Sequence, residues 1–123
     1  MEDRDVARLL AWGRIAIGGA LFLAPKKAAT LWSGEEQPAF PNNMIVRGLG
    51  ARDVILGAGT AVALESGGSA SSWLQACAAA DASDAVGTLS AFRDLPKGRA
   101  LLYLATEIGA AVLGLSLAES LES

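Results

Sequence analysis

Four apolar stretches, each about 20 residues long, alternate with short polar connections along the chain. The pattern predicts helices over residues 5–24, 43–64, 72–93 and 99–121. Pro25 ends the first stretch, and the turn-forming runs SGEEQPAFP, ESGGSAS and DLPKG separate the others. Each stretch is long enough to cross a hydrocarbon core of about 30 Å.

Short connections favour antiparallel neighbours. We therefore predict a single all-α domain over residues 1–123, folded as an antiparallel four-helix transmembrane bundle. The segment PKKAATLW predicts a short interfacial helix, with Lys26 and Lys27 among the headgroups and Trp32 in the aromatic belt. Small residues at four-residue spacing predict close helix packing. They are Ala16, Ala20 and Ala24; Gly57 and Ala61; Ala78 and Ala82; and Ala110, Gly114 and Ala118.

Composition supports a membrane protein, since 52% of the residues are hydrophobic and the mean hydropathy is +0.38. No predicted helix has the charged outer face of a water-soluble amphipathic helix. The connections after the first and third helices hold five basic residues, whereas the N-terminal flank holds Arg4 and Arg8. The five are Lys26, Lys27, Arg93, Lys97 and Arg99. This asymmetry predicts a multi-pass cell-membrane protein with both termini outside the cytoplasm.

Charge and composition also exclude some functions. A net charge of -3 argues against a nucleic-acid partner, because phosphate binding needs clustered basic residues. The chain has no histidine and one cysteine, Cys77, so we expect no metal site, no cofactor and no intrachain disulfide. Any acid/base chemistry must use carboxylates.

Ionisable residues recur near the middle of all four stretches. They are Arg14, the pair Arg52 and Asp53, the pair Asp81 and Asp84, and Glu107. In an antiparallel bundle they share one depth. Charges at membrane depth are costly and usually face a bundle interior or a water-filled cavity, so they predict a functional site. Two arginines face four carboxyl groups, and we expect at least one carboxyl group to be protonated.

The residue types suggest separate roles within this layer. Asp53, Asp81 and Asp84 are the candidate acid/base groups, and Arg52 is the candidate residue that orients the water. The candidate binding residues are Arg14, Arg47, Glu107 and Tyr103. Three alternatives stay open: the ion pairs only fix helix order, Arg47 only reaches toward the interface, and Tyr103 only anchors there.

The segments RGLGARDVILGAG at 47–59 and WLQACAAADASDAVGTL at 73–89 resemble the signature of a small, largely uncharacterised family of four-helix integral-membrane proteins common in actinobacteria. The resemblance covers most of the chain. Its hallmarks are an Arg-Asp pair on the second helix, here Arg52 and Asp53, and an acidic pair on the third, here Asp81 and Asp84. The family implies no established activity. The chain is also loosely similar to fungal membrane epoxide hydrolases of natural-product clusters, which implies a hydrolase.

These features predict a membrane protein that binds a lipophilic small molecule and performs acid/base chemistry on it, such as epoxide opening, isomerisation or cyclisation. The expected partners are the lipid bilayer and that small molecule. One alternative is a small proton-coupled transporter that works as a homo-oligomer. Another is an accessory membrane subunit in which the ion pairs are architectural.

Overall fold

The computed structural model describes residues 1–35 and 42–122, and every regular element within them is helical. The elements are α1 (Asp3–Leu23), α2 (Pro25–Ser33), α3 (Asn42–Ser66), α4 (Ala70–Ser90), the short 3-10 helix η1 (Phe92–Asp94) and α5 (Lys97–Ser120). Long helices lie close to all four predicted ranges, and α2 is the predicted short helix. The third long helix ends earlier than predicted, at Ser90, because the chain tightens into η1.

Local sequence explains where the helices begin and end. Glu2 and Asp5 form a reciprocal capping box at the start of α1. Pro25 ends α1 and opens α2, since proline fits the first turn of a helix but not its interior. Gly34 after α2 and Gly67 after α3 have φ values of 80° and 72°, which favour glycine.

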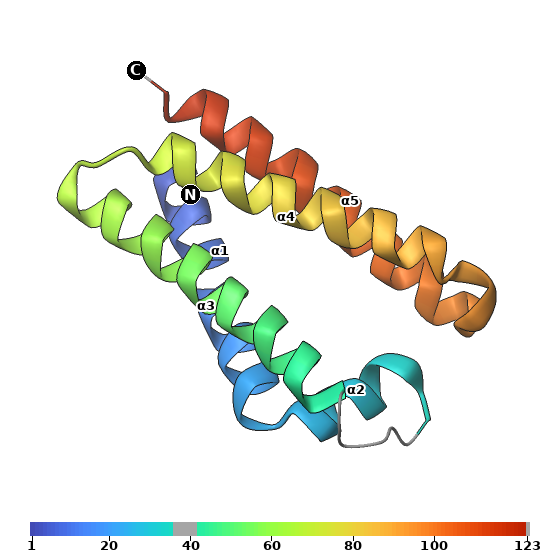
Figure 1. The fold of residues 1–123 in the computed structure, drawn as a ribbon. Helices are drawn as coiled ribbons and strands as arrows, with labels where there is room; N and C mark the ends of the chain where they lie inside the picture. Colours follow the sequence, from blue (N-terminus) through green and yellow to red (C-terminus); the bar gives the residue numbers. More distant parts are fainter. Residues whose placement is uncertain (36–41, 123) are drawn as a thin grey trace.

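The four long helices form two hairpins, whose backbones come together at one end and diverge toward the other (Figure 1). α1 packs along α3, and α4 packs along α5, whereas contacts between the two hairpins are far fewer. We call the joined end, with both chain termini, the narrow end. The wide end holds the end of α1, α2, the start of α3, η1 and the start of α5. The all-α class is confirmed, while the predicted antiparallel four-helix transmembrane bundle is not.

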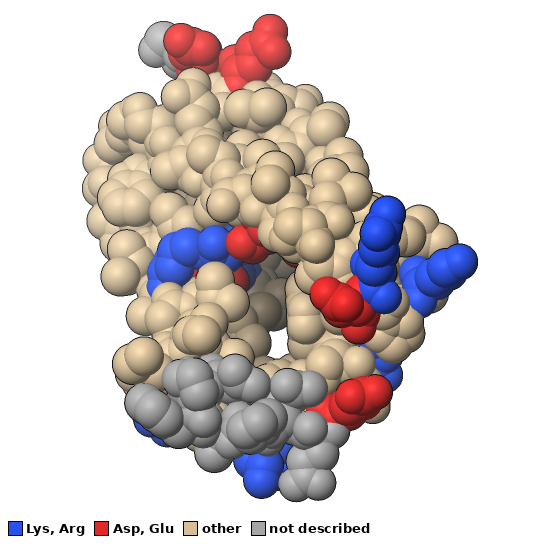
Figure 2. Space-filling view, turned by 45° about the vertical axis from the view of Figure 1, so that its right-hand side comes forward, with Lys and Arg blue, Asp and Glu red and all other residues tan. Residues whose placement is uncertain are grey.

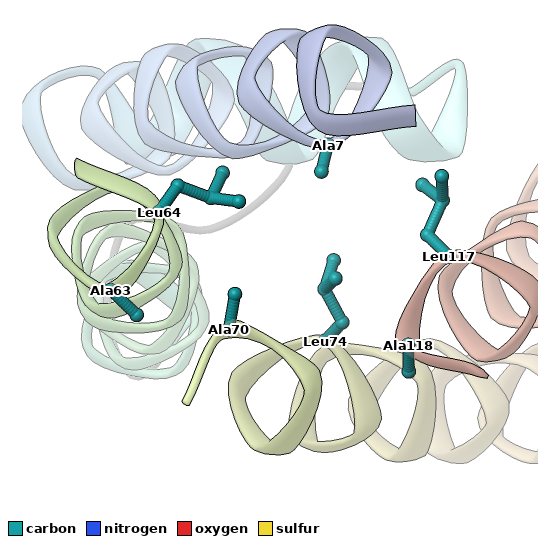
Figure 3. Close-up of a cluster of buried hydrophobic side chains, with 7 residues drawn as sticks. All are labelled: Ala7, Ala63, Leu64, Ala70, Leu74, Leu117 and Ala118. Atoms are coloured by element: carbon teal, nitrogen blue, oxygen red, sulfur yellow. The ribbon is translucent and has the colours of Figure 1, made fainter. Parts of the chain in front are cut away.

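The hydrophobic core lies at the narrow end, where all four long helices contribute to it (Figure 3). Its buried members are Ala7, Ala63, Leu64, Ala70, Leu74, Leu117 and Ala118. Most of them are alanines, so the core buries little apolar area per residue. The hairpins are therefore held together elsewhere by polar contacts as well.

Glycines set the close approach of α1 and α3. A Cβ atom on Gly50 would lie 2.5 Å from the carbonyl oxygen of Gly18, and one on Gly57 would lie 2.6 Å from that of Ala11. The buried stripe on α1 is Ala7, Ala11 and Gly18. The predicted packing role of Ala16 and Ala20 is wrong, because both are exposed.

On α4, Ala82 is likewise exposed, so its predicted packing role is also wrong. The other small residues predicted on α3, α4 and α5 are buried or half-buried: Gly57, Ala61, Ala78, Ala110, Gly114 and Ala118.

We expect Gly50→Ala to destabilise the fold by about 1–3 kcal/mol, because the new methyl group meets backbone of α1 that cannot rotate away. The matched control is Gly13→Ala, where an added Cβ has nothing within 4 Å. That change should be neutral or stabilise by up to about 1 kcal/mol, since alanine is the better helix former. Thermal unfolding in detergent, followed by circular dichroism, measures both. Equal effects would show that the two helices do not approach closely at Gly50.

The outer surface carries the large apolar side chains. α1 and α5 are long and apolar enough to cross a membrane, and only 17% of the most apolar part of each is buried. Leu9, Trp12, Ile17, Leu101 and Val112 are all exposed. A water-soluble monomer rarely exposes so much apolar surface. α3 and α4, also predicted to be spans, are less apolar because they carry the central charged residues and many small residues.

Candidate functional site: a buried charge network

Arg14 of α1 and Asp81 of α4 form a two-pronged ion pair at mid-length. The Nη1 and Nη2 atoms of Arg14 donate to Oδ1 and Oδ2 of Asp81 at 3.0 and 2.5 Å. Asp81 is 7% exposed. Such bidentate contacts combine charge with fixed geometry, so this pair ties the first hairpin to the second.

Arg52 of α3 and Asp84 of α4 make a second pair of the same kind. Nη1 and Nη2 of Arg52 donate to Oδ1 and Oδ2 of Asp84 at 2.9 and 2.8 Å. Asp81 and Asp84 lie three residues apart and therefore share one face of α4. That face presents both carboxylates to the neighbouring hairpin.

Asp53 joins the two pairs into one network. Its Oδ1 atom lies 3.5 Å from Nη1 of Arg14 and 3.2 Å from Nη2 of Arg52. The order of contacts is Asp81, Arg14, Asp53, Arg52, Asp84, and we call these five residues the charge network. With two arginines and three aspartates, its formal charge is -1 when all are ionised.

The local geometry of α3 separates Arg52 from Asp53. Neighbouring residues on a helix point about 100° apart. Asp53 accordingly faces α1, where its Cβ lies close to Gly18, and Arg52 reaches across to α4. The sequence predicted this division, with one side chain of the pair toward each neighbouring helix.

One carboxylate oxygen of the network, Oδ2 of Asp53, contacts neither arginine. Both arginine contacts to Asp53 involve Oδ1, and no group in residues 1–35 or 42–122 donates a hydrogen bond to its Oδ2. The Nε atom of Arg52 is buried and likewise has no partner among these residues. Asp53 therefore combines a fixed position with a carboxylate oxygen that can accept a proton.

Glu107 of α5 lies beside the network but outside its ion pairs. Its Oε1 atom accepts a hydrogen bond of 2.8 Å from Oγ1 of Thr88, which follows Asp84 by one turn of α4. Glu107 is close enough to interact electrostatically with Asp81 and Asp84. Within the part of the chain that the structure describes, no arginine or lysine pairs with it. The sequence did not predict the part played by Thr88.

The structure does not bring Arg47 and Tyr103 into this site, although both were predicted binding residues. Arg47 is exposed, its Nε donates to the carbonyl oxygen of Phe22 at 3.1 Å, and its guanidinium lies 5.9 Å from the centre of the Phe22 ring. It lies too near the start of α3 to reach mid-length. Tyr103 stacks on Trp32 of α2 instead, with ring centres 3.7 Å apart and planes at 6°.

The contacts around Tyr103 join the hairpins at the wide end. The Tyr103 hydroxyl donates to the carbonyl oxygen of Trp32 at 2.5 Å, and Arg99 donates to that of Leu31. We call Leu31, Trp32, Arg99 and Tyr103 the clasp. Sequence reasoning placed Trp32 and Tyr103 in the aromatic belt but gave no sign that they touch.

An opening lies between the two hairpins, and basic and acidic side chains border it (Figure 2). On the narrow side, a cavity of about 30 Å³ is lined by Arg14, Thr60, Cys77 and apolar neighbours. A space of that size holds one water molecule if polar partners are present. The cavity therefore places room for one water molecule beside Arg14 of the charge network.

The stacked rings of the clasp, Trp32 and Tyr103, should contribute measurably to the free energy of unfolding. We expect Trp32→Ala and Tyr103→Ala each to lower stability, with a coupling of about 1 kcal/mol between them, because either change alone removes the stacked pair. The measurement is a double-mutant cycle of thermal unfolding in detergent. The control cycle pairs Tyr103→Ala with Trp12→Ala, on the outward face of α1, and should be additive. Additivity in both cycles would show that the rings do not interact in solution.

Comparisons with known proteins find no match to this chain among family models, curated proteins or solved structures. Membership of the four-helix actinobacterial family therefore stays a prediction. In the described residues, no three acidic or cysteine side chains are grouped so that they could hold a metal ion. The arginines lie between the aspartates, so charge pairing dominates the chemistry of the network.

Proposed function

We propose that the chain is a multi-pass membrane protein whose long helices surround the charge network within the bilayer. The support is the distribution of side chains, since α1 and α5 expose large apolar residues while Asp81 is buried between helices. Water-soluble proteins have the reverse arrangement. Charged groups inside a membrane protein, in turn, face one another or a cavity.

We infer that the opening between the hairpins binds a lipophilic small molecule and that the acidic groups beside it perform acid/base chemistry on that molecule. Epoxide opening by water is the reaction that these groups fit best. The observation that carries this proposal is the geometry of Asp53, whose Oδ1 atom contacts two arginines while its Oδ2 atom contacts neither, beside a cavity with room for one water molecule. Acid-assisted isomerisation or cyclisation uses the same two kinds of group.

We assign the proposed roles from the pairing of each carboxyl group. Asp53 accepts a proton from water as the water oxygen attacks an epoxide carbon. The carbon–oxygen bond of the ring breaks, Glu107 donates a proton to the released oxygen, and the product is a vicinal diol. We assign the donor role to Glu107 because each aspartate of the network already pairs with arginine. Asp81 and Asp84, predicted as acid/base groups, then act by positioning Arg14 and Arg52.

The test is turnover of a long-chain terminal epoxide by the purified protein in lipid nanodiscs, with product analysis by mass spectrometry. Diol formation is expected. A single turnover in ¹⁸O-labelled water should place the label in every diol molecule, because water attacks directly. Unlabelled diol in the first turnover would instead mean that an aspartate attacks the epoxide and forms an ester. Absence of diol with epoxides of several chain lengths, together with no retained ligand in native mass spectrometry, would contradict the proposal.

An architectural role is a second candidate, because both arginines form bidentate ion pairs that join the hairpins. Fully paired charges of this kind can fix how helices pack without any chemistry. In that case, apolar replacement of a complete pair should preserve every property of the protein. The enzyme proposal instead requires some variants that fold normally and have no turnover.

A further inference from the structure

The two ends of the molecule carry opposite charge. At the wide end the described residues include six basic side chains, Lys26, Lys27, Arg47, Arg93, Lys97 and Arg99, and two acidic ones, Glu35 and Asp94, a formal +4. At the narrow end they include two basic side chains, Arg4 and Arg8, and six acidic ones, Glu2, Asp3, Asp5, Glu65, Glu119 and Glu122, a formal -4. The apolar outer surface of the helices separates these two groups.

The opening lies in the half of the molecule that ends in basic residues. On the narrow side of the charge network, the core residues of all four long helices close the gap between the hairpins. On the wide side of the charge network, the close approach of Gly18 to Gly50 joins α1 to α3, so it does not connect the two hairpins. The hairpins separate in this half until the clasp joins them again (Figure 1).

We propose that the wide end binds anionic phospholipid headgroups, and that the ligand of the charge network enters the opening sideways from the leaflet that contains those lipids. This inference rests on the proposed function. Anionic lipids are concentrated in the cytoplasmic leaflet, and basic residues beside a membrane span are attracted to it. The wide end then lies on the cytoplasmic side, and both termini lie outside.

Three side chains suit phosphate contact best. Lys27, Arg93 and Lys97 are exposed at the wide end, and long basic side chains there can extend into the headgroup layer. Arg99 is already engaged with the Leu31 carbonyl oxygen, and Arg47 with that of Phe22. The lipid should therefore be recognised by its negative charge more than by the shape of one headgroup.

The orientation is tested with single cysteines in a Cys77→Ala background, since Cys77 is the only native cysteine. Glu122→Cys marks the narrow end, and Gly98→Cys, where an added Cβ has nothing within 4 Å, marks the wide end. A membrane-impermeant maleimide applied to intact bacterial cells should label Glu122→Cys. It should label Gly98→Cys only after the cells are permeabilised. The opposite pattern would overturn the inference.

The entry route is tested by photolabelling in liposomes that contain either phosphatidylglycerol or phosphatidylcholine with a diazirine in the acyl chain. Labelled peptides are identified by mass spectrometry. The anionic probe should label segments 15–23 and 82–90 several-fold more than the zwitterionic probe. The triple variant Lys27→Gln, Arg93→Gln, Lys97→Gln should lose this preference. The matched narrow-end variant Arg4→Gln, Arg8→Gln should keep it.

The two proposals fail in different ways in this experiment. Equal labelling of the opening by both probes would overturn the anionic-lipid inference and leave the binding function intact. A preference for the anionic probe at the narrow end would also overturn the inference. No labelling of the opening by either probe would count against the proposed function itself.

Discussion

Replacement of Arg14 by leucine is expected to lower the free energy of unfolding by about 3–5 kcal/mol, the typical cost of breaking a buried ion pair. Without Arg14, the buried carboxylate of Asp81 loses both of its hydrogen-bond donors. Arg52 alone then faces three aspartates, and the formal charge of the network becomes -2. Thermal unfolding in detergent, followed by circular dichroism, measures the loss.

A second substitution, Asp81→Leu, should restore most of the stability that Arg14→Leu removes. In the double variant Arg14→Leu, Asp81→Leu, Asp53 keeps its contact to Arg52, and Arg52 keeps Asp84. Well-packed apolar residues often replace a buried ion pair at little cost. The variant Asp81→Asn should be milder than Arg14→Leu, because Arg14 retains Asp53 and the network becomes neutral.

A half-exposed arginine on the same helix serves as control. Arg8 pairs with Asp5 and Glu65 at the surface, so Arg8→Leu should leave the unfolding midpoint nearly unchanged. If Arg14→Leu behaves like Arg8→Leu, Arg14 and Asp81 do not form a buried pair. A double variant less stable than Arg14→Leu would contradict the expected recovery.

The sequence is sufficient to predict the helices and the level along them at which the charged residues meet, because apolar length and turn residues are local properties. It also predicts that Arg52 and Asp53 point toward different neighbours, which follows from helix geometry alone. The partner of each arginine is not predictable in this way. Arg14 pairs with Asp81 of α4 and less closely with Asp53 of α3, and that choice depends on the relative rotation and height of three helices.

The separation of the hairpins leaves no clear sign in the hydrophobic pattern. Apolar periodicity predicts each helix separately, whereas the packing between helices depends on which small residues face one another. Gly18 meets Gly50, but Ala16 and Ala20, at equally suitable spacing along the chain, point outward. Likewise, Trp32 and Tyr103 are 71 residues apart, and only the tertiary fold brings their rings together.

Asp53→Asn is expected to lower epoxide turnover about 10²- to 10⁴-fold, the usual contribution of a positioned acid or base. Asparagine has nearly the same shape, its side-chain oxygen can still accept a hydrogen bond from Arg52, and Arg14 keeps its bidentate pair with Asp81, so the fold should persist. Diol production in nanodiscs and the unfolding midpoint are measured on the same preparation. Glu65→Gln is the control, because Glu65 is exposed and remote from the network. Full activity of Asp53→Asn would remove Asp53 from the mechanism.

The pH profile separates the two catalytic roles. A general base must be deprotonated to act, so the wild-type rate should fall at acid pH as Asp53 takes up a proton. A general acid must be protonated, so the rate should also fall at alkaline pH as Glu107 loses one. Glu107→Gln should reduce turnover and remove the fall in rate at alkaline pH. Thr88→Val deletes the hydrogen bond to Glu107, so it should shift the pH of that fall without abolishing activity. An alkaline fall that persists unchanged in Glu107→Gln would assign the proton donor to another residue.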